Sequence, residues 1–188
     1  MRQLTATVIS NETVLPGTEH SSGRKISRVC LSWLKCPEIA HAARPGQFVM
    51  VSCGEECVLP RPFSIHQVAE DRIALYYNIW EEGKGTLWLA GRKAGNGINL
   101  FGPLGNSYSI HPASRRVLLV AGGIGIASLR YLADEAVKQG LEVMLLCGTP
   151  THHQYPATFL PPEITLVPVT EDGSIGQQGQ LCQRVIQR

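Results

Sequence analysis

The stretch VLLVAGGIGIA, residues 117–127, places an apolar run directly before a glycine-rich turn. Five apolar residues in a row, 117–121, predict a strand that is buried on both faces. Gly122, Gly123 and Gly125 then predict a dinucleotide-type phosphate loop between that strand and a following helix. The pattern is not a complete G-x-G-x-x-G, and a tight strand-to-helix turn that needs glycine for packing is the alternative.

Downstream of this turn the sequence follows an α/β pattern. Apolar residues at helical spacing predict a helix from about Ile126, and a β-forming run at 142–147 predicts a second strand. A strand, a helix and a strand in this order predict a parallel βαβ unit. Further along, we predict a third strand at 164–169 and a second helix at 181–186. Together these elements predict a partial Rossmann-like parallel α/β domain over residues 113–188.

Upstream of residue 113 the pattern is all-β. Short runs of β-forming residues recur between Pro-Gly, Ser-Gly and Asn-Gly breaks, at residues 4–9, 26–33, 47–52, 73–79 and 98–101. One helical insert is predicted near residues 86–92. Evenly spaced strands of this kind indicate a small barrel or sandwich. The sequence therefore predicts two domains, a β domain over 1–112 and the α/β domain over 113–188.

Composition argues against several classes of function. The 188 residues carry a net charge of +2 and no long run of one sign, so the concentrated basic stripe typical of nucleic-acid binding is absent. No apolar stretch reaches the length of a membrane span, and the first five residues lack the apolar core of a signal peptide. We therefore expect a cytoplasmic protein. Since no nucleophile and base stand in an arrangement for hydrolysis, we assign no catalytic side chain.

The six cysteines are scattered, at positions 30, 36, 53, 57, 147 and 182. Only Cys53 and Cys57 are close in the sequence, and a zinc site would need a second pair at similar spacing. An iron–sulfur centre would need four clustered cysteines. We therefore expect reduced thiols, with no metal site and no iron–sulfur cluster in this chain.

Two segments of the β domain carry groups suited to a phosphate-bearing cofactor. In Arg61-Pro62-Phe63-Ser64, proline fixes the backbone and arginine offers a forked donor that matches phosphate oxygens. A serine hydroxyl can hydrogen-bond a flavin ring nitrogen, and a flat aromatic side chain can lie against the flavin ring system. The alternative is an edge strand that begins at a proline.

The second segment, G-K-G-T at residues 83–86, stands at the start of the predicted helical insert. Its glycines let the backbone approach a ligand closely, and free amides together with the helix dipole make such an end an anion site. A glycine turn followed by a threonine cap is an equally good interpretation. A third segment, G-P-L-G-N at residues 102–106, is by itself only a turn.

Taken in order, the segments R-P-F-S, G-K-G-T, G-P-L-G-N and A-G-G-I-G-I-A resemble the motifs of the ferredoxin-reductase superfamily. The stretches P-G-Q-F-V at residues 45–49 and E-D-G-S-I-G at residues 171–176 are similar to one branch of it, the electron-transfer subunits of heteromeric NAD-dependent dihydroorotate dehydrogenases. This resemblance covers nearly the whole chain. It implies a Greek-key antiparallel β-barrel that binds FAD, followed by an NAD-binding unit.

The resemblance also implies roles for individual residues. Arg61 would hold the FAD pyrophosphate, Ser64 would face the isoalloxazine ring, and Gly85 with Thr86 would seat phosphate. The full set of candidate cofactor contacts is Arg61, Pro62, Phe63, Ser64, Tyr77, Asn78, Gly83, Lys84, Gly85, Thr86, Gly122, Gly123 and Gly125.

Two features depart from the superfamily. Ser128 stands where the glycine loop usually ends in proline. The chain also stops at Arg188, before the later strand, the nicotinamide-placing segment and the cysteine cluster found in relatives. If the three predicted strands lie in the order 3-2-1, one side of the 117–121 strand has no neighbour within the chain. We therefore expect a truncated member whose open edge is covered by a partner chain or by self-association.

Three functional hypotheses follow. The first is an electron-transfer flavoprotein, in which NAD(P)H reduces FAD and electrons pass to a redox partner protein, such as a dihydroorotate dehydrogenase catalytic subunit. The second is a non-catalytic module that binds FAD or a partner and has lost nicotinamide turnover. The third is an oxidoreductase similar to cytochrome b5 reductase, with a different electron acceptor.

Overall fold

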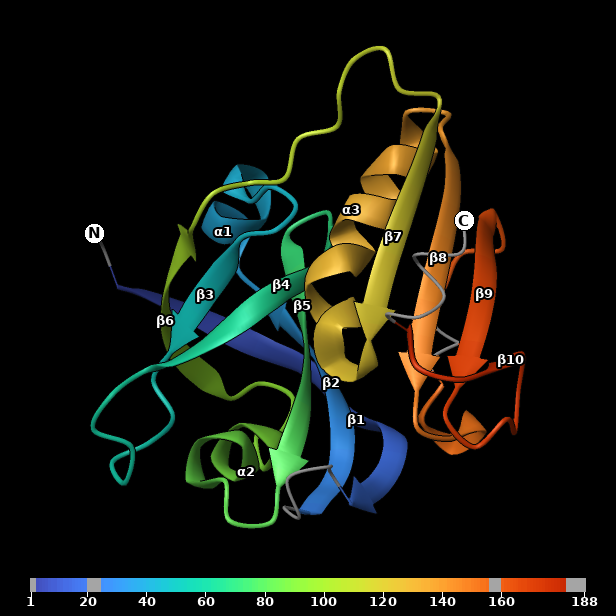
Figure 1. Ribbon diagram of the computed structural model, residues 1–188. Coiled ribbons are helices and arrows are strands. Elements are labelled where there is room, and N and C mark those ends of the chain that lie inside the picture. Colours follow the sequence, from blue (N-terminus) through green and yellow to red (C-terminus); the bar gives the residue numbers. More distant parts are fainter. Residues whose placement is uncertain (1–2, 20–24, 156–159, 182–188) are drawn as a thin grey trace. The chain divides into compact units, whose positions relative to one another are not determined.

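The computed structural model describes residues 3–19, 25–155 and 160–181, which form two compact units (Figure 1). The first unit spans Met1–Tyr108 and the second spans Ser109–Arg188. The division lies in the exposed segment between the last strand of the first unit and the first strand of the second. The boundary predicted from the sequence, after residue 112, falls in the same segment.

Six antiparallel strands close the first unit into a barrel in the order β1-β2-β5-β4-β3-β6. Because the consecutive strands β3, β4 and β5 are neighbours and β6 returns to lie beside β3, the barrel contains a Greek key. This confirms the predicted antiparallel barrel. The strands are β1 (Leu4–Glu19), β2 (Lys25–Lys35), β3 (Phe48–Val51), β4 (Arg61–Ala69), β5 (Arg72–Trp80) and β6 (Gly97–Leu104).

Two short helices accompany the barrel. α2 (Lys84–Ala90) is the helical insert expected near residues 86–92, and it begins two residues earlier than predicted. α1 (Pro37–Ala42) was not predicted, because six residues are too few to show a helical period. Its signal is a proline at the first helical position, where the missing N–H has no helical partner in any case.

The barrel core is apolar, and its strands alternate between inward and outward side chains as a pleated sheet requires. The largest side chains that are fully buried inside this unit are Val8, Leu34, Ile39, Ile65, Ile73, Leu75, Ile79, Leu89, Ile98 and Leu100. They come from α1, α2 and every strand of the barrel except β3, so most of the unit shares one core.

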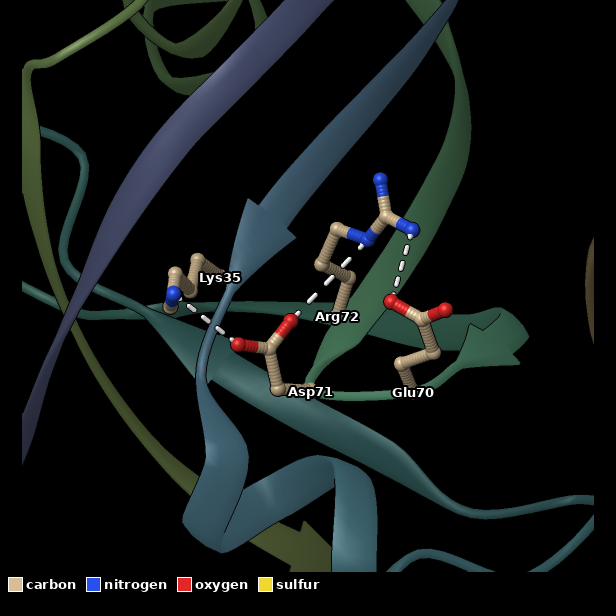
Figure 2. A network of polar contacts seen from close by, with 4 residues as sticks. All are labelled: Lys35, Glu70, Asp71 and Arg72. Atoms are coloured by element: carbon tan, nitrogen blue, oxygen red, sulfur yellow. Dashed lines mark hydrogen bonds and ion pairs between the residues drawn. The ribbon is translucent and has the colours of Figure 1, made fainter.

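A network of charged side chains lies at the tight turn between β4 and β5 (Figure 2). Oδ2 of Asp71 forms an ion pair with Nζ of Lys35 at 3.0 Å, and Oδ1 of Asp71 lies 4.0 Å from Nε of Arg72. Arg72 also pairs with Glu70 at 3.3 Å. Since Lys35 ends β2, this network ties the end of that strand to the β4–β5 turn.

The second unit is a parallel sheet of four strands in the order β10-β9-β8-β7, with one long helix against it. The strands are β7 (Arg116–Gly122), β8 (Glu142–Thr149), β9 (Ile164–Thr170) and β10 (Gln177–Gln178), and the helix α3 spans Ile126–Lys138. This confirms the βαβ unit, the third strand and the 3-2-1 order. β10 was not predicted because it has only two residues. The helix expected at 181–186 lies almost wholly outside the described residues.

The prediction that β7 is buried on both faces is wrong. Leu119 and Ala121 are buried, whereas Leu118 is 49% exposed and Val120 is 37% exposed. β7 pairs with β8 on one side, and no other described strand pairs with its second side. An edge strand with a helix against one face buries alternate residues only, so a continuous apolar run did not mean two buried faces.

Candidate cofactor-binding site

Arg61, at the start of β4, and Gly85, in the first turn of α2, lie against each other. A Cβ atom added at Gly85 would lie 3.0 Å from Cγ and 3.5 Å from Nε of Arg61, and 3.4 Å from Cβ of Cys53. A side chain at position 85 would therefore crowd Arg61, which would have to shift by a few tenths of an ångström. Arg61 itself is exposed, and within the described ranges no carboxylate forms an ion pair with it. Its forked guanidinium is available to an external anion.

The other residues of the G-K-G-T segment have local partners. The Thr86 hydroxyl donates a hydrogen bond to the Gly83 carbonyl at 3.1 Å, and the Lys84 ammonium pairs with Glu56 at 3.3 Å in an exposed position. A Cβ atom at Gly83 would lie 2.8 Å from the Thr86 hydroxyl oxygen. The packing interpretation thus accounts for Gly83. α2 has only seven residues, so its dipole is a weak source of anion binding.

The pleat of β4 sends neighbouring residues of the R-P-F-S motif to opposite faces. Ser64 is half-buried and paired with Phe48 of β3, and Pro62 is exposed and paired with Met50. These four side chains share the outer surface of the barrel. Phe63 is buried inside, where its ring meets that of Tyr77 edge-on at 5.2 Å.

Tyr77 also belongs to the barrel interior. Its hydroxyl lies 2.9 Å from that of Ser32 and donates to Oδ1 of Asn11 at 3.4 Å. Burial raises the pKa of this phenol far above its usual range. The sequence places both Phe63 and Tyr77 among the cofactor contacts; the structure buries both side chains, and their role as contacts stays a prediction. The half-buried Asn78 stays a prediction.

A loop between β3 and β4 is held against α2. Cys53 and Cys57 are both buried, and the Cys53 thiol donates to the Val51 carbonyl at 3.5 Å. Desolvation by burial, with a smaller effect of Cys57, raises the pKa of the Cys53 thiol to about 11. Gly54 lies so close to the indole of Trp88 that a Cβ atom there would come within 2.5 Å of Nε1. These thiols are packing groups, and the described residues include no cluster of three potential metal ligands.

The glycine loop after β7 contains one glycine that the chain's own backbone does not require. Gly123 has φ +50, a conformation that favours glycine, but Gly125 has φ −57 and ψ −22, which any residue adopts. A Cβ atom at Gly125 would meet no atom of the described residues within 4 Å. Packing therefore explains a glycine at neither 123 nor 125. The Ser128 hydroxyl donates to the Gly125 carbonyl at 3.2 Å, which gives the residue that replaces proline a local role.

The E-D-G-S-I-G segment forms the turn from β9 to β10. Oδ1 of Asp172 accepts hydrogen bonds from the Ser174 backbone N–H at 2.9 Å and from its hydroxyl at 2.6 Å, and these bonds lower the pKa of the carboxyl. The Ser174 oxygen in turn accepts from the His152 backbone N–H at 2.8 Å. The loops after β8 and β9 are thereby joined at the carboxyl edge of the sheet, where the Gly125 loop also lies. Ligands of open α/β sheets bind at this edge.

No protein family model matches the chain. Its sequence is nevertheless similar to curated proteins. It is 37% identical over 149 residues to the dihydroorotate dehydrogenase B (NAD(+)) electron transfer subunit of Desulforamulus reducens, covering 76% of this chain and 56% of that protein. The subunit of the same name from Caldanaerobacter subterraneus subsp. tengcongensis is 37% identical over 139 residues, 72% of this chain and 52% of that protein. The chain thus spans about half the length of the curated relatives it matches.

Solved structures resemble the fold over almost the full chain. An NADH-dependent reduced ferredoxin–NADP oxidoreductase superposes with a TM-score of 0.79 at 24% identity, covering 97% of this chain and 62% of that one. A ferredoxin NADP+ reductase from Neisseria gonorrhoeae, solved with bound FAD and NADP, gives a TM-score of 0.75 at 14% identity and covers 100% of this chain and 76% of that one. The chain has the fold of these ferredoxin-reductase-like structures.

The structure brings together only part of the predicted set of cofactor contacts. Arg61, Gly85 and Cys53 meet on the barrel, and Gly122, Gly123 and Gly125 form the loop at the carboxyl end of β7. Sequence reasoning gave no role to Asn11, and it quoted Ser174 only as part of the E-D-G-S-I-G segment. A lone asparagine in a strand carries no local signal, whereas Asp172 followed two residues later by Ser174 is a side-chain-to-backbone turn pattern that could have been recognised.

Proposed function

We propose that this chain belongs to an electron-transfer flavoprotein that moves electrons between NAD(P)H and a partner protein. FAD would bind on the barrel unit, with its diphosphate at Arg61. The observation that carries the proposal is the contact between Arg61 and Gly85, which leaves a guanidinium with no ion pair among the described residues next to a position without a side chain. The names of the curated relatives support a dihydroorotate dehydrogenase catalytic subunit as the partner.

The residues present fit FAD in two ways. The Arg61 fork matches phosphate oxygens, and the outer surface formed by Phe48, Met50, Pro62 and Ser64 offers apolar area and one hydroxyl for a flat polar ring. Bound FAD would supply the redox chemistry, taking up a hydride and passing electrons on. The chain's own residues would bind and orient it, and no side chain need act as acid or base.

For NAD(P)H we propose the loop of Gly122, Gly123 and Gly125. Gly125 supports this assignment, because its backbone has ordinary helical angles and the space for a side chain is open. An open position next to backbone N–H groups at the start of α3 suits the close approach of a pyrophosphate.

A second candidate function is a module that binds FAD or a partner protein without nicotinamide turnover. The edge position of β7 favours it, since a dinucleotide crevice forms where strand order reverses beside the first strand, and the described sheet continues on one side of β7 only. Anaerobic mixing with NADH separates the two. Bleaching of the bound flavin within milliseconds supports the enzyme, and flavin that stays oxidised for minutes supports the module.

The main test is the identity and affinity of the flavin. We expect a yellow protein that releases FAD, and Arg61→Ala should weaken FAD binding by about 1.5–3 kcal/mol, the usual worth of a hydrogen bond to a charged group. Arg61→Lys should recover only part of the loss, because an ammonium group does not copy a forked contact. A protein that stays colourless with FAD, or an Arg61→Ala variant of unchanged affinity, contradicts the assignment.

We also propose that the exposed edge of β7 associates with a partner chain or with a second copy. Leu118 and Val120 support this, since an unpaired apolar edge strand is a template for further pairing. Light scattering should give a solution mass above that of one chain. We further expect metal analysis to find no iron, and two irons per chain would contradict the reading of the cysteines as separate thiols.

A further inference from the structure

The side chain of Asn11 in β1 contacts the carboxyl end of α2. Its Nδ2 donates hydrogen bonds to the backbone carbonyls of Leu89 at 2.7 Å and Arg92 at 3.2 Å. The last four carbonyls of a helix have no partner within the helix. A side chain distant in sequence therefore caps the carboxyl end of α2, and the Leu89 side chain beside that cap is fully buried.

Two hydroxyls hold the Asn11 side chain in this orientation. The Ser32 hydroxyl donates to Oδ1 of Asn11 at 2.9 Å, and the Tyr77 hydroxyl lies 3.4 Å from the same oxygen. Carbonyl oxygens can only accept, so the amide nitrogen has to face Leu89 and Arg92. Every polar atom of the Asn11 carboxamide thus has a partner, and such a fully satisfied group fixes a unique geometry.

The other end of α2 is the cofactor site. The helix is seven residues long, so its two ends are about 10 Å apart and move as one segment. At its first turn, Gly85 is in contact with Arg61 and Cys53. The distance between α2 and the start of β4 therefore depends on how the far end of α2 is held.

We propose that Asn11 is a positioning residue for the diphosphate of FAD. It makes no hydrogen bond to Arg61 or Gly85 among the described contacts and acts through α2, whose capped carboxyl end sets the place of Gly85 against Arg61. This inference rests on the proposed FAD function. It predicts an effect confined to the diphosphate half of the cofactor, because Ser64, proposed to face the flavin ring, lies on β4 and has no contact with α2 among the described hydrogen bonds.

The test compares FAD with riboflavin, which has the same ring and no phosphate. Asn11→Asp keeps the shape of the side chain but replaces the amide nitrogen with a carboxylate oxygen, which cannot donate to the carbonyls of Leu89 and Arg92. Both of these hydrogen bonds are therefore lost. We expect the dissociation constant of FAD to rise about tenfold, the effect of losing one hydrogen bond to a charged group. That of riboflavin, followed by quenching of its fluorescence, should change by less than about twofold. Asn11→Ala, which adds no charge, should give the same selective loss and serves if Asn11→Asp does not fold.

Thr13→Ala is the matched control. Thr13 is also on β1, and its hydroxyl contacts Cys30 of β2 at 3.9 Å rather than α2. Both flavins should bind this variant as they bind the wild type. Equal weakening of FAD and riboflavin in both Asn11 variants, or unchanged FAD affinity, would overturn the positioning role while leaving the proposed function standing. A wild-type chain that binds neither flavin would remove both.

Discussion

Substitutions of single residues can show whether the glycine loop after β7 binds a ligand or only forms a tight turn. Gly125 has backbone angles that alanine adopts and open space around its Cβ position. Gly125→Ala should therefore leave the stability unchanged or raise it by up to about 1 kcal/mol, by reducing the freedom of the unfolded chain. NAD(P)H binding should weaken at least about tenfold, because the added methyl group fills the space proposed for the pyrophosphate.

Thermal unfolding and titration with NADH measure the two effects. Gly123→Ala is the control, because φ at this position is +50 and alanine there should cost about 1 kcal/mol of stability. If Gly125→Ala binds NADH as the wild type does, the loop is only a turn and the proposed dinucleotide site is wrong.

Asp71 provides a prediction about pH. A hydrogen bond from Lys35, followed by smaller charge effects of Lys35 and Arg72, lowers the pKa of this carboxyl below its ordinary value. A carboxyl whose pKa is lower in the folded state stabilises the fold above its unfolded pKa, and this contribution disappears as the pH falls through the folded pKa. Lys35→Met should therefore lower the urea midpoint at pH 7, and the difference from wild type should shrink below about pH 4.

Lys93→Met removes an exposed lysine that has no ion pair within the described residues, and it should have little effect at either pH. A Lys35→Met difference that stays constant from pH 7 to pH 3 would show that the pair in Figure 2 is not linked to folding.

Among the elements, the turn from β9 to β10 depends on Gly176. Its φ is +66, and a Cβ atom there would lie 2.2 Å from the backbone oxygen of Pro168 in β9. Gly176→Ala should cost about 2–3 kcal/mol, since strain and a backbone clash act together. Gly173→Ala is the matched comparison in the same turn, with φ +72 but only the flexible Gln178 side chain nearby, and should cost about 1 kcal/mol. Equal losses in thermal unfolding would show that contact with β9 does not matter.

On the scale of the whole molecule, the two units provide a test of where FAD binds. The segment between β6 and β7 is exposed and has a turn at residues 111–114, where insertions are tolerated best. A protease site inserted after Pro112 should be cleaved without loss of flavin, because every proposed FAD contact lies before Tyr108. Gel filtration after cleavage should find FAD with the barrel fragment, and release of the flavin would show that the second unit is needed to hold it.

The sequence alone determined the order and type of most elements, although not of α1 and β10. Short β-forming runs between glycine and proline breaks indicated a small barrel or sandwich, and the resemblance of the motifs implied an antiparallel barrel. The strand, glycine loop, helix and strand of residues 116–149 indicated a parallel unit, because these patterns have local periods. It also singled out Arg61 and Gly85, though not their contact. Tertiary structure decided that β7 has one buried face, that Phe63 and Tyr77 point inward, and that Asn11 caps α2. Each of these features depends on which strand or helix lies beside the residue. The local periodicity of the sequence carries no information about neighbours that are distant in the chain.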